Sequence, residues 1–332
     1  QRQMCIRDSG TGPFIFEEWV KDDHITMVRN PAYWGTPADI DRLTFRSVPD
    51  IAARAASFLA GEADVVTDIQ PVMVPVVQAR DGLSLLAEEG MRIVFVKPNT
   101  RIDSPMTDVR VRQALNYGID KEAIVASVMG GFATVSPGQV VSSQYWGFNP
   151  DLEAYPYDPA KAKALLADAG YPNGFDIRMS VPRGRYMNDA EIGQALAGQL
   201  EDIGVNVKVE TREFSVHNKE FYTQEGGPLF LIGYKAPPDT GIMLSIFESS
   251  HPNSQHVDPV YDDMVNDALA ETDADLRLEK TNAASEYFRE QAIAIFLHQQ
   301  WLLTGVHDRV QDFHTYPDGR IYFGNVDISG SR

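Results

Sequence analysis

Short apolar segments alternate with helix-like segments through the middle of the chain, and this order most constrains its fold. A helix-like segment over 159–169 precedes an apolar strand over 175–181, and a second helix before Gly204 precedes the period-two strand "VNVKVE". The unit then repeats with a helix near 216–223 and the apolar strand "PLFLIGY". This order is typical of α/β units and not of a helical bundle or a β-sandwich.

Start and stop signals mark the helices of these units. Asp158 is the expected N-cap of the first helix, with Pro159 at the first helical position and Gly170 at the C-cap. Asn188 or Asp189 is expected to cap the second helix. The apolar face of the first helix consists of Ala162, Leu165, Leu166 and Ala169.

Two more helices and two more strands extend the α/β pattern. Asp258 and Pro259 open one helix, and Thr272 or Asp273 opens the next, before the strand "AIAIFLHQQWLLTG". Upstream, the strand "RIVFVKPNT" precedes one helical stretch over about residues 107–129. The segments "RIVFV" and "IAIFL" therefore bracket a compact α/β block, as two hinge crossings beside an inserted lobe would.

The N-terminal part has a different pattern. Turns join three strand-like segments, "GPFIFEEWV", "HITMVRNPAYW" and "LTFRSVP", and a helix over 51–60 and the short strand "ADVV" follow them. We interpret this part as a portion of a sheet domain without its beginning.

The first nine residues are expected to be a processing scar. The segment Met4–Ser9, "MCIRDS", resembles the translation of a transposase end sequence used in sequencing libraries. Cys5 is the single cysteine of the chain, so the remainder contains none. A thiol-free chain of this size is consistent with an oxidising compartment.

The charge and hydropathy of the chain exclude two classes of protein. The formal net charge is -18 at pH 7, whereas binding to a nucleic acid backbone requires a clustered positive surface. The chain is 43% apolar but contains no apolar run long enough to span a bilayer. We therefore expect a soluble globular protein without a nucleic acid partner.

Sequence signatures of common enzyme sites do not occur in the chain. It has no Gly-x-Ser-x-Gly elbow, no His-Glu-x-x-His motif, no phosphate-binding loop and no cysteine nucleophile outside the first nine residues. We therefore expect a protein that is not an enzyme and that needs no cofactor. A hydrolase is the less favoured alternative.

Several long segments, in order, resemble one family. They are "GTGPFIFEEW", "VRNPAYWGTPADIDRLTFRSVPD", "FLAGEADVV", "SPMTDVRVRQALNYGIDKEAIV", "YWGFNPDLEAYPYDPAKAKALLADAGYPNGF" and "LEDIGVNVKVE". The resemblance is to the family 5 extracellular solute-binding proteins of ABC importers, in their dipeptide and oligopeptide branch. It covers Gly10 to the C-terminus, and it implies an N-terminally truncated member whose signal region has been lost.

This resemblance implies a two-lobe α/β fold, the type II or Venus flytrap fold of periplasmic binding proteins, with the first lobe incomplete. Residues 10–90 would be a remnant of lobe I, residues 91–296 would form lobe II, and residues 297–332 would return to lobe I. Closure of the two lobes on a ligand would then be driven by the ligand's preference for the closed state.

The resemblance also implies a function. A monomer in the periplasm or outside the cell, either free or lipid-anchored, would capture a peptide or a similar small ligand in an interlobe cleft and deliver it to an ABC permease in the membrane. A non-peptide solute, such as an oligosaccharide, an opine, a nickel chelate or haem, is the alternative ligand on the same fold.

Peptide-binding members of the family hold the peptide carboxylate with a basic side chain, and that position falls on "PRGRYMND". Arg183 or Arg185 could therefore clamp a ligand carboxylate, because a guanidinium group offers two parallel charged hydrogen bonds. The alternative is that both are solvated loop residues before a helix.

The family's amine-binding acid lies near a Gly-Trp segment, where this chain has "LIGYKAPPDTGIML". Tyr234 stands where the family usually has tryptophan, and an ungapped alignment puts Pro237 at the acid. Asp239 is the nearest carboxylate. It could replace the acid, or it could cap the helix that follows.

The resemblance places several further residues near the cleft. Tyr145, Trp146, Tyr186 and Tyr234 could stack on a ligand or fill the core, and for Trp146 we favour the core. Asn99 could contact the ligand or turn the chain after its strand, and we favour the turn.

Two histidines raise the question of a metal site, because the family also contains binders of nickel chelates and haem. His251 and His256 lie in "HPNSQH" without a third ligand nearby. We interpret both as solvated loop residues and expect no metal site.

Overall fold

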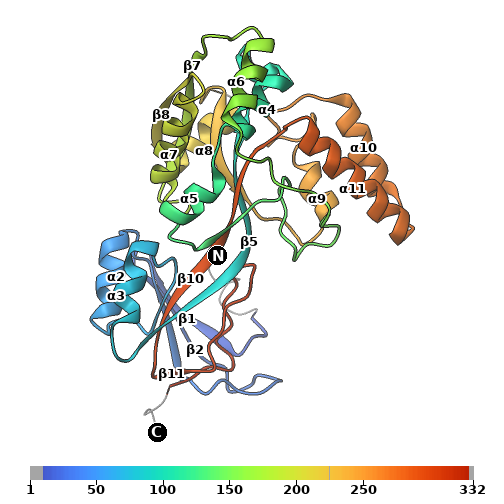
Figure 1. The fold of residues 1–332 in the computed structure, drawn as a ribbon. Helices are drawn as coiled ribbons and strands as arrows, with labels where there is room; N and C mark the ends of the chain where they lie inside the picture. The colour runs from blue at the N-terminus through green and yellow to red at the C-terminus, as the bar shows by residue number, and fades with distance from the viewer. Residues whose placement is uncertain (1–9, 224, 329–332) are drawn as a thin grey trace. The chain divides into compact units, whose positions relative to one another are not determined.

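The structure of the chain is a computed structural model that describes residues 10–223 and 225–328. The chain folds into two compact units (Figure 1). Unit 1 contains the described residues up to Glu88 together with those from Leu302, and unit 2 contains Glu89–Trp301. Both boundaries fall inside a strand. The division into lobes near residues 90 and 296 stays a prediction about the whole protein.

Unit 1 is built around a small antiparallel sheet with the order β1-β2-β3. A bulge between Phe16 and Glu18 interrupts the pairing of β1 with β2. The N-cap of α2 is Asp50, whose side chain accepts a hydrogen bond from the backbone of Ala53. The elements of this unit are β1 (Phe14–Val20), β2 (His24–Arg29), β3 (Arg42–Arg46), α2 (Ile51–Leu59), β4 (Val65–Val66), η1 (Pro71–Met73), α3 (Val74–Gln78), β11 (Val310–Gln311) and β12 (Asp327–Ile328).

Unit 2 contains a mixed sheet with the strand order β10-β5-β9-β7-β8, and β6 pairs with β10. Strand β7 runs parallel to β8 and β9, whereas β5 runs antiparallel to β9. The parallel strands are joined through helices, as the alternating sequence pattern predicts. The strands are β5 (Leu83–Pro98), β6 (Ala133–Val135), β7 (Phe175–Arg183), β8 (Val205–Glu213), β9 (Leu229–Tyr234) and β10 (Ile295–His307), of which β5 and β10 continue into unit 1.

The helices of unit 2 confirm most of the expected caps. Asp158 accepts a hydrogen bond from the backbone N–H of Lys161, and Asp258 and Asp273 cap their helices in the same way. Residue Thr272 is therefore not the cap. The helices are η2 (Pro105–Thr107), α4 (Val109–Tyr117), α5 (Lys121–Ser127), α6 (Pro159–Asp168), α7 (Asp189–Glu201), α8 (Phe214–Thr223), α9 (Thr240–Ser245), α10 (Pro259–Ala270) and α11 (Ala274–Glu290).

The single helical stretch expected over 107–129 is wrong. The chain instead forms η2, α4 and α5, because α4 ends at Tyr117 with Gly118 as its C-cap, and Asp120 starts a new helix by accepting the N–H of Ala123. The side chain of Lys121 turns inward at this break, where its Nζ donates to the carbonyl oxygens of Asn116 at 2.7 Å and Tyr155 at 3.2 Å. Burial lowers the pKa of Lys121 to about 8.

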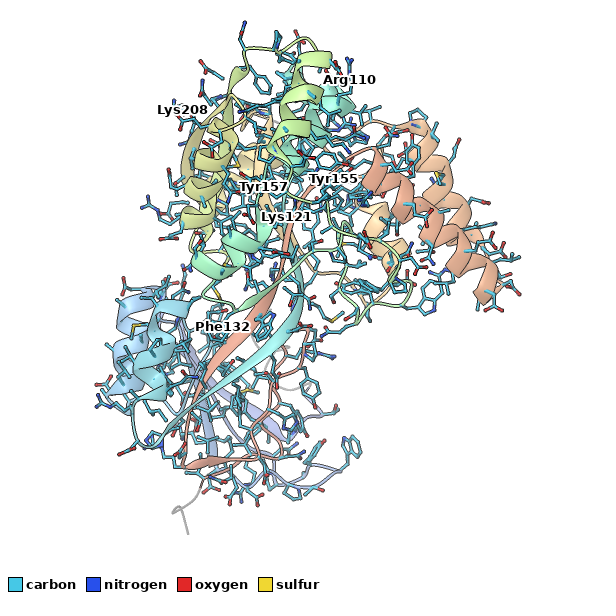
Figure 2. The ribbon with its side chains drawn as sticks, in the orientation of Figure 1. Arg110, Lys121, Phe132, Tyr155, Tyr157 and Lys208 are labelled. Atoms are coloured by element: carbon cyan, nitrogen blue, oxygen red, sulfur yellow. The ribbon has the colours of Figure 1, made fainter. Side chains whose placement is uncertain are left out.

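Aromatic side chains fill the core of unit 2. The rings of Phe247 and Phe288 meet edge to face with their centroids 4.7 Å apart, and Phe296 lies 6.0 Å from Phe288. Tyr155, which is labelled in Figure 2, is also buried. Its ring stacks on that of Phe296. These contacts pack α11 and β10 against the loop before α6.

Candidate functional site

One edge of the unit 2 sheet gathers most of the residues that the sequence singled out. Parallel strands β7 and β9 end at this edge, in Arg183 and Tyr234. Strand β5 is antiparallel to β9, and its residue Ile93 pairs with Tyr234, so Arg92 lies at the same edge. We call this end of the sheet, where β7 and β9 terminate, the carboxyl edge. In open α/β sheets, ligands bind beyond the carboxyl ends of the strands.

The loop after β7 is held by a buried carboxylate. Oδ2 of Asp189 accepts the N–H groups of Arg185 at 2.8 Å and Tyr186 at 3.1 Å, and Oδ1 accepts that of Gly184 at 3.2 Å. Asp189 is only 4% exposed, and burial raises the pKa of its carboxyl group. Of the two expected caps, Asn188 occupies the N-cap position with φ 52° but makes no capping bond with its side chain. Asp189 instead fixes the loop.

Both Arg183, at the end of β7, and Arg185, in the loop, are exposed. The guanidinium carbon of Arg185 lies 4.9 Å from the ring centroid of Phe214 and 5.8 Å from that of Tyr186. Arg183 closes β7 opposite Glu213, its partner in β8. Their exposure leaves both side chains accessible to a ligand. A role in clamping a ligand carboxylate stays a prediction.

Tyr186 packs beneath this loop instead of projecting from it. It is 6% exposed, and its hydroxyl donates to the carbonyl oxygen of Gly233 at 3.4 Å. The same oxygen accepts a hydrogen bond from Nη1 of Arg92 at 3.0 Å, and the guanidinium carbon of Arg92 lies 5.6 Å from the Tyr186 ring centroid. Sequence reasoning missed Arg92, although a cation in the apolar run "RIVFV" was a usable signal.

The side chain of Tyr234 points into the core. Its ring meets Phe95 edge to face at 5.5 Å, and burial raises the pKa of its hydroxyl well above the usual value. The ring also faces Lys97, whose Nζ lies 5.3 Å from its centroid and 3.9 Å from that of Phe247. Lys97 is 1% exposed and donates to the carbonyl oxygen of Asn253 at 2.8 Å, and burial holds its pKa well below the usual range.

A second segment of the carboxyl edge, residues 236–240, is fastened to the loop that carries Tyr145 and Trp146. The Tyr145 hydroxyl accepts the N–H of Ala236 at 2.9 Å, and Trp146 bridges to Asp239 in a parallel pairing. Tyr145 is 3% exposed and belongs to the core. Trp146, in contrast, is 38% exposed, so the core interpretation of this residue is wrong.

Asp239 already has partners within the protein. Its Oδ1 accepts the N–H of Ile242 at 3.1 Å, which makes it the N-cap of α9, as one of the two sequence interpretations held. Its Oδ2 accepts from Nη2 of Arg277 at 2.7 Å. The guanidinium carbon of Arg277 also lies 4.6 Å from the Trp146 ring centroid. Sequence reasoning missed Arg277, since 38 residues separate it from Asp239 in the chain.

Asn99 does not join the others. Strand β5 leaves the carboxyl edge at Arg92, and Asn99 follows its far end beside Pro228, which is about 20 Å from Tyr234 at the usual rise of a strand. The Asn99 side-chain oxygen accepts the N–H of Arg101 at 3.0 Å, which confirms the turn that we favoured.

One of the two histidines departs from the sequence interpretation. His256 is only 5% exposed, and its Nδ1 lies 3.1 Å from the hydroxyl of Thr100, so the solvated interpretation is wrong for this residue. His251 is partly buried and accepts the N–H of Asn253. In residues 10–223 and 225–328, no group of three or more His, Cys, Asp or Glu side chains is placed to hold a metal ion.

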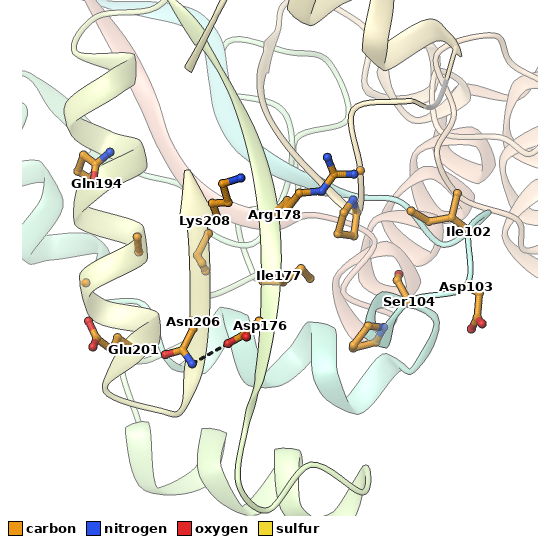
Figure 3. A pocket seen from close by; sticks show the side chains of 16 residues that line it. Ile102, Asp103, Ser104, Asp176, Ile177, Arg178, Gln194, Glu201, Asn206 and Lys208 are labelled. Carbon is orange, nitrogen blue, oxygen red and sulfur yellow. Dashed lines mark hydrogen bonds between the residues drawn. The ribbon is translucent and has the colours of Figure 1, made fainter. Parts of the chain in front are cut away.

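A large open pocket of about 960 Å³ lies at the other edge of the sheet (Figure 3). The first residues of β7 and β8 line it, including Asp176 and Asn206, which are joined by a hydrogen bond of 2.8 Å. The cations on its wall include Arg178, which pairs with Glu210. We assign the candidate site to the carboxyl edge despite this pocket, because helix starts and strand ends converge there.

Known proteins resemble this chain over nearly its whole length. The dipeptide-binding protein of Escherichia coli K12 is 30% identical over 335 residues, which cover 98% of this chain and 62% of that protein. Heme-binding protein A of Haemophilus influenzae is also 30% identical, with 98% of this chain and 60% of that protein covered. The chain thus spans about three fifths of the length of these relatives.

Solved structures show the same fold. The dipeptide-binding protein of Pseudoalteromonas sp. SM9913, in complex with Met-Leu, is 26% identical and superposes with a TM-score of 0.83 over 96% of this chain and 64% of that one. The expected periplasmic-binding-protein fold of the α/β class is therefore confirmed. Residues 9–255 match the family described as bacterial extracellular solute-binding proteins, family 5 Middle. The chain belongs to the family 5 bacterial extracellular solute-binding proteins.

Proposed function

We propose that this protein is the solute-binding component of an ABC importer, that it captures a peptide or a similar small carboxylate-bearing solute, and that it passes this solute to a membrane permease. The loop after β7 is the observation that carries the proposal. Asp189 fixes the loop backbone at the carboxyl edge, and two arginines are exposed there, Arg183 at the end of β7 and Arg185 in the loop itself. A fixed backbone with charged donors suits the binding of an anion.

The proposal needs no covalent chemistry. A solute receptor works by binding alone, and its ligand shifts it toward the state that the ligand prefers. Peptides are the favoured ligand class because the relatives include dipeptide-binding proteins of several bacteria.

The remaining attributes follow from the same assignment. We propose a monomer in the periplasm or outside the cell, free or lipid-anchored, with an ABC permease as its protein partner. In the part of the chain that the structure describes, no helix is long and apolar enough to cross a membrane.

A non-peptide solute is the second candidate. The relatives include a heme-binding protein, and solved neighbours of the same fold were determined with agropinic acid or with a nickel–histidine complex. The engagement of Asp239 by Arg277 favours this candidate, because a carboxylate that already pairs with a guanidinium group is not available for a peptide ammonium group.

Calorimetric titration of the full-length gene product tests the proposal. Alanyl-phenylalanine, hemin and a nickel–histidine complex are titrated separately into protein freed of ligand by partial unfolding and refolding. We expect micromolar or tighter binding of the dipeptide. Binding of hemin or of the nickel complex without the dipeptide would select the second candidate, and hydrolysis of the dipeptide would contradict a pure receptor.

A further inference from the structure

The chain passes between its two compact units twice, once within β5 and once within β10. On β5 the passage falls between Glu88 and Glu89, and on β10 it falls between Trp301 and Leu302. The two strands are neighbours in the sheet. Because these are the only covalent connections between the units, any change in their relative orientation must bend both strands.

Consecutive glutamates at the first passage are tied to different units. Glu88 accepts a hydrogen bond from the hydroxyl of Thr315, which belongs to unit 1 as Glu88 does. Glu89 accepts one from the hydroxyl of Thr134 at 2.8 Å, within unit 2. Successive side chains of a strand point to opposite faces, so neighbouring residues can have such different partners. The side-chain anchoring of β5 thus changes units at the step 88–89.

The hydroxyl of Thr134 also joins β10 to this arrangement. Its Oγ1 accepts a hydrogen bond from the indole Nε1 of Trp301 at 2.9 Å while it donates to Glu89. A hydroxyl has one donor and two acceptor positions, so it can serve both partners at once. Glu89 and Trp301 are the first and last residues of unit 2. One side chain therefore links the two strands at the points where they leave this unit.

Strand β6, which carries Thr134, is itself held against β10. Thr134 pairs with Gln299 in antiparallel register, and the ring of Phe132 meets that of Trp301 edge to face with centroids 6.2 Å apart. The side-chain amide of Gln299 donates to the backbone carbonyl of Gly90 at 2.8 Å, a buried bond between β10 and β5. We call Glu89, Thr134, Gln299 and Trp301 the strand clasp.

Beyond the proposed function, we infer that Thr134 is a positioning residue: through the strand clasp it holds β5 and β10 together where they leave unit 2, so that bending between the units falls at the steps 88–89 and 301–302. Its effect on binding rests on the proposed function. Strands held together allow fewer relative orientations of the units than strands that bend independently. A larger fraction of molecules then has the arrangement that binds solute, and the apparent affinity rises with that fraction.

Spin labels on the full-length gene product measure this role without any ligand. The substitutions Lys21→Cys in unit 1 and Lys163→Cys in unit 2 place the two labels at exposed positions, in a background whose other cysteines are replaced by serine. Double electron–electron resonance then gives the distribution of the distance between the labels. Thr134→Val keeps the side-chain shape but loses both hydrogen bonds, so we expect the distribution to widen by about 1.5-fold or more.

Three further variants control this measurement. Thr134→Ser retains the hydroxyl and should restore the wild-type width. Thr107→Val removes a hydroxyl that donates to the carbonyl oxygen of Ser104 at 3.0 Å, outside the strand clasp, and should leave the width unchanged. Trp301→Phe removes the indole donor and is the second variant if Thr134→Val does not fold; it should also widen the distribution. A wild-type width in the variant that folds, or equal widening in Thr134→Ser or Thr107→Val, would overturn the inference.

Calorimetric titration of alanyl-phenylalanine into the same proteins measures the effect on binding. We expect Thr134→Val to weaken binding by about three- to tenfold, because a smaller fraction of molecules is competent to bind, and Thr134→Ser to bind like the wild type. Wild-type affinity in a variant with a widened distribution would overturn the role in binding. Failure of the wild type to bind alanyl-phenylalanine, hemin or the nickel–histidine complex would contradict the proposed function, whereas the distance measurement would still decide whether the strand clasp exists.

Discussion

Oδ2 of Asp189 lies 2.8 Å from the backbone nitrogen of Arg185, so a buried carboxylate of α7 sets the path of the loop that carries the exposed arginines. The helix begins at Asp189, and its side chain turns back onto the loop instead of outward. One residue thus couples the start of the helix to the geometry of the candidate site.

Replacement of this carboxylate should loosen the loop. In Asp189→Asn an amide group would face N–H donors, which is expected to lower the free energy of unfolding by about 1–3 kcal/mol and to weaken ligand binding. Urea unfolding and calorimetry measure the two effects. Asp176→Asn, at the exposed start of β7, is the control and should change neither by much. Equal stability of the Asp189→Asn variant and the wild type would contradict the prediction.

The loop arginines should differ from other surface arginines in their effect on binding. We expect Arg183→Ala or Arg185→Ala to weaken dipeptide binding by about 1.5–3 kcal/mol, as loss of a charged hydrogen bond does. Arg178→Ala alters the same strand at its other end, where the side chain pairs with Glu210, and should leave binding unchanged. If neither loop variant differs from Arg178→Ala in titration, both arginines are solvated loop residues.

Close backbone contact makes Gly174 irreplaceable. It has φ +73°, and a Cβ there would lie 1.7 Å from the carbonyl oxygen of Gly204. Gly170 is the control, because it has φ +93° but nothing within 4 Å. Gly170→Ala should cost about 1–2 kcal/mol from its backbone conformation alone. Gly174→Ala should cost more than about 3 kcal/mol, since the turn that aligns β7 with β8 must shift. Denaturant unfolding that gave similar losses for both would refute the steric argument.

Buried His298 should make stability fall in acid. Its ring is 1% exposed, no described residue partners either ring nitrogen, and burial lowers its pKa to about 4. The unfolded chain therefore binds the proton first, so this contribution to stability is complete above about pH 6.5 and is lost as the pH falls toward 4. The loss from pH 7 to pH 5 is about 2 kcal/mol for this residue.

His298→Leu isolates this effect. Between pH 7 and pH 5, the free energy of unfolding of this variant should fall by about 2 kcal/mol less than that of the wild type. His314→Gln changes an exposed histidine and is the control, expected to follow the wild type. Unfolding curves at pH 7 and pH 5 measure these changes. If the free energy of unfolding changed equally in all three proteins, His298 would not be the source of the loss of stability in acid.

Several predictions about the site are confirmed because they rest on local rules. The sequence favours a turn at Asn99, and its side chain accepts the N–H of Arg101, two residues ahead. Asp239 before Thr-Gly carries a capping signal, and the cap is present. The failures concern burial. Trp146 is exposed and His256 is buried, and neither fact can be read from the neighbouring residues.

The missed partners share one property. Arg277 meets Asp239 from 38 residues away, and Arg92 meets Gly233 from 141 residues away. Each contact depends on which strands and helices become neighbours. Sequence periodicity does not predict which strands and helices become neighbours, because it reports the face that a residue occupies and not the element opposite it.

The sequence by itself determined the α/β class, the order of strands and helices and most helix starts, because periodicity and capping act within a few residues. It also determined the family, through long ordered segments that resemble known members. Only the tertiary structure decided that helix 107–129 breaks at Asp120, that Asn99 lies at the opposite sheet edge, and that Asp239 is paired. Those outcomes depend on burial and long-range contacts, whose free energies exist only when distant segments pack together.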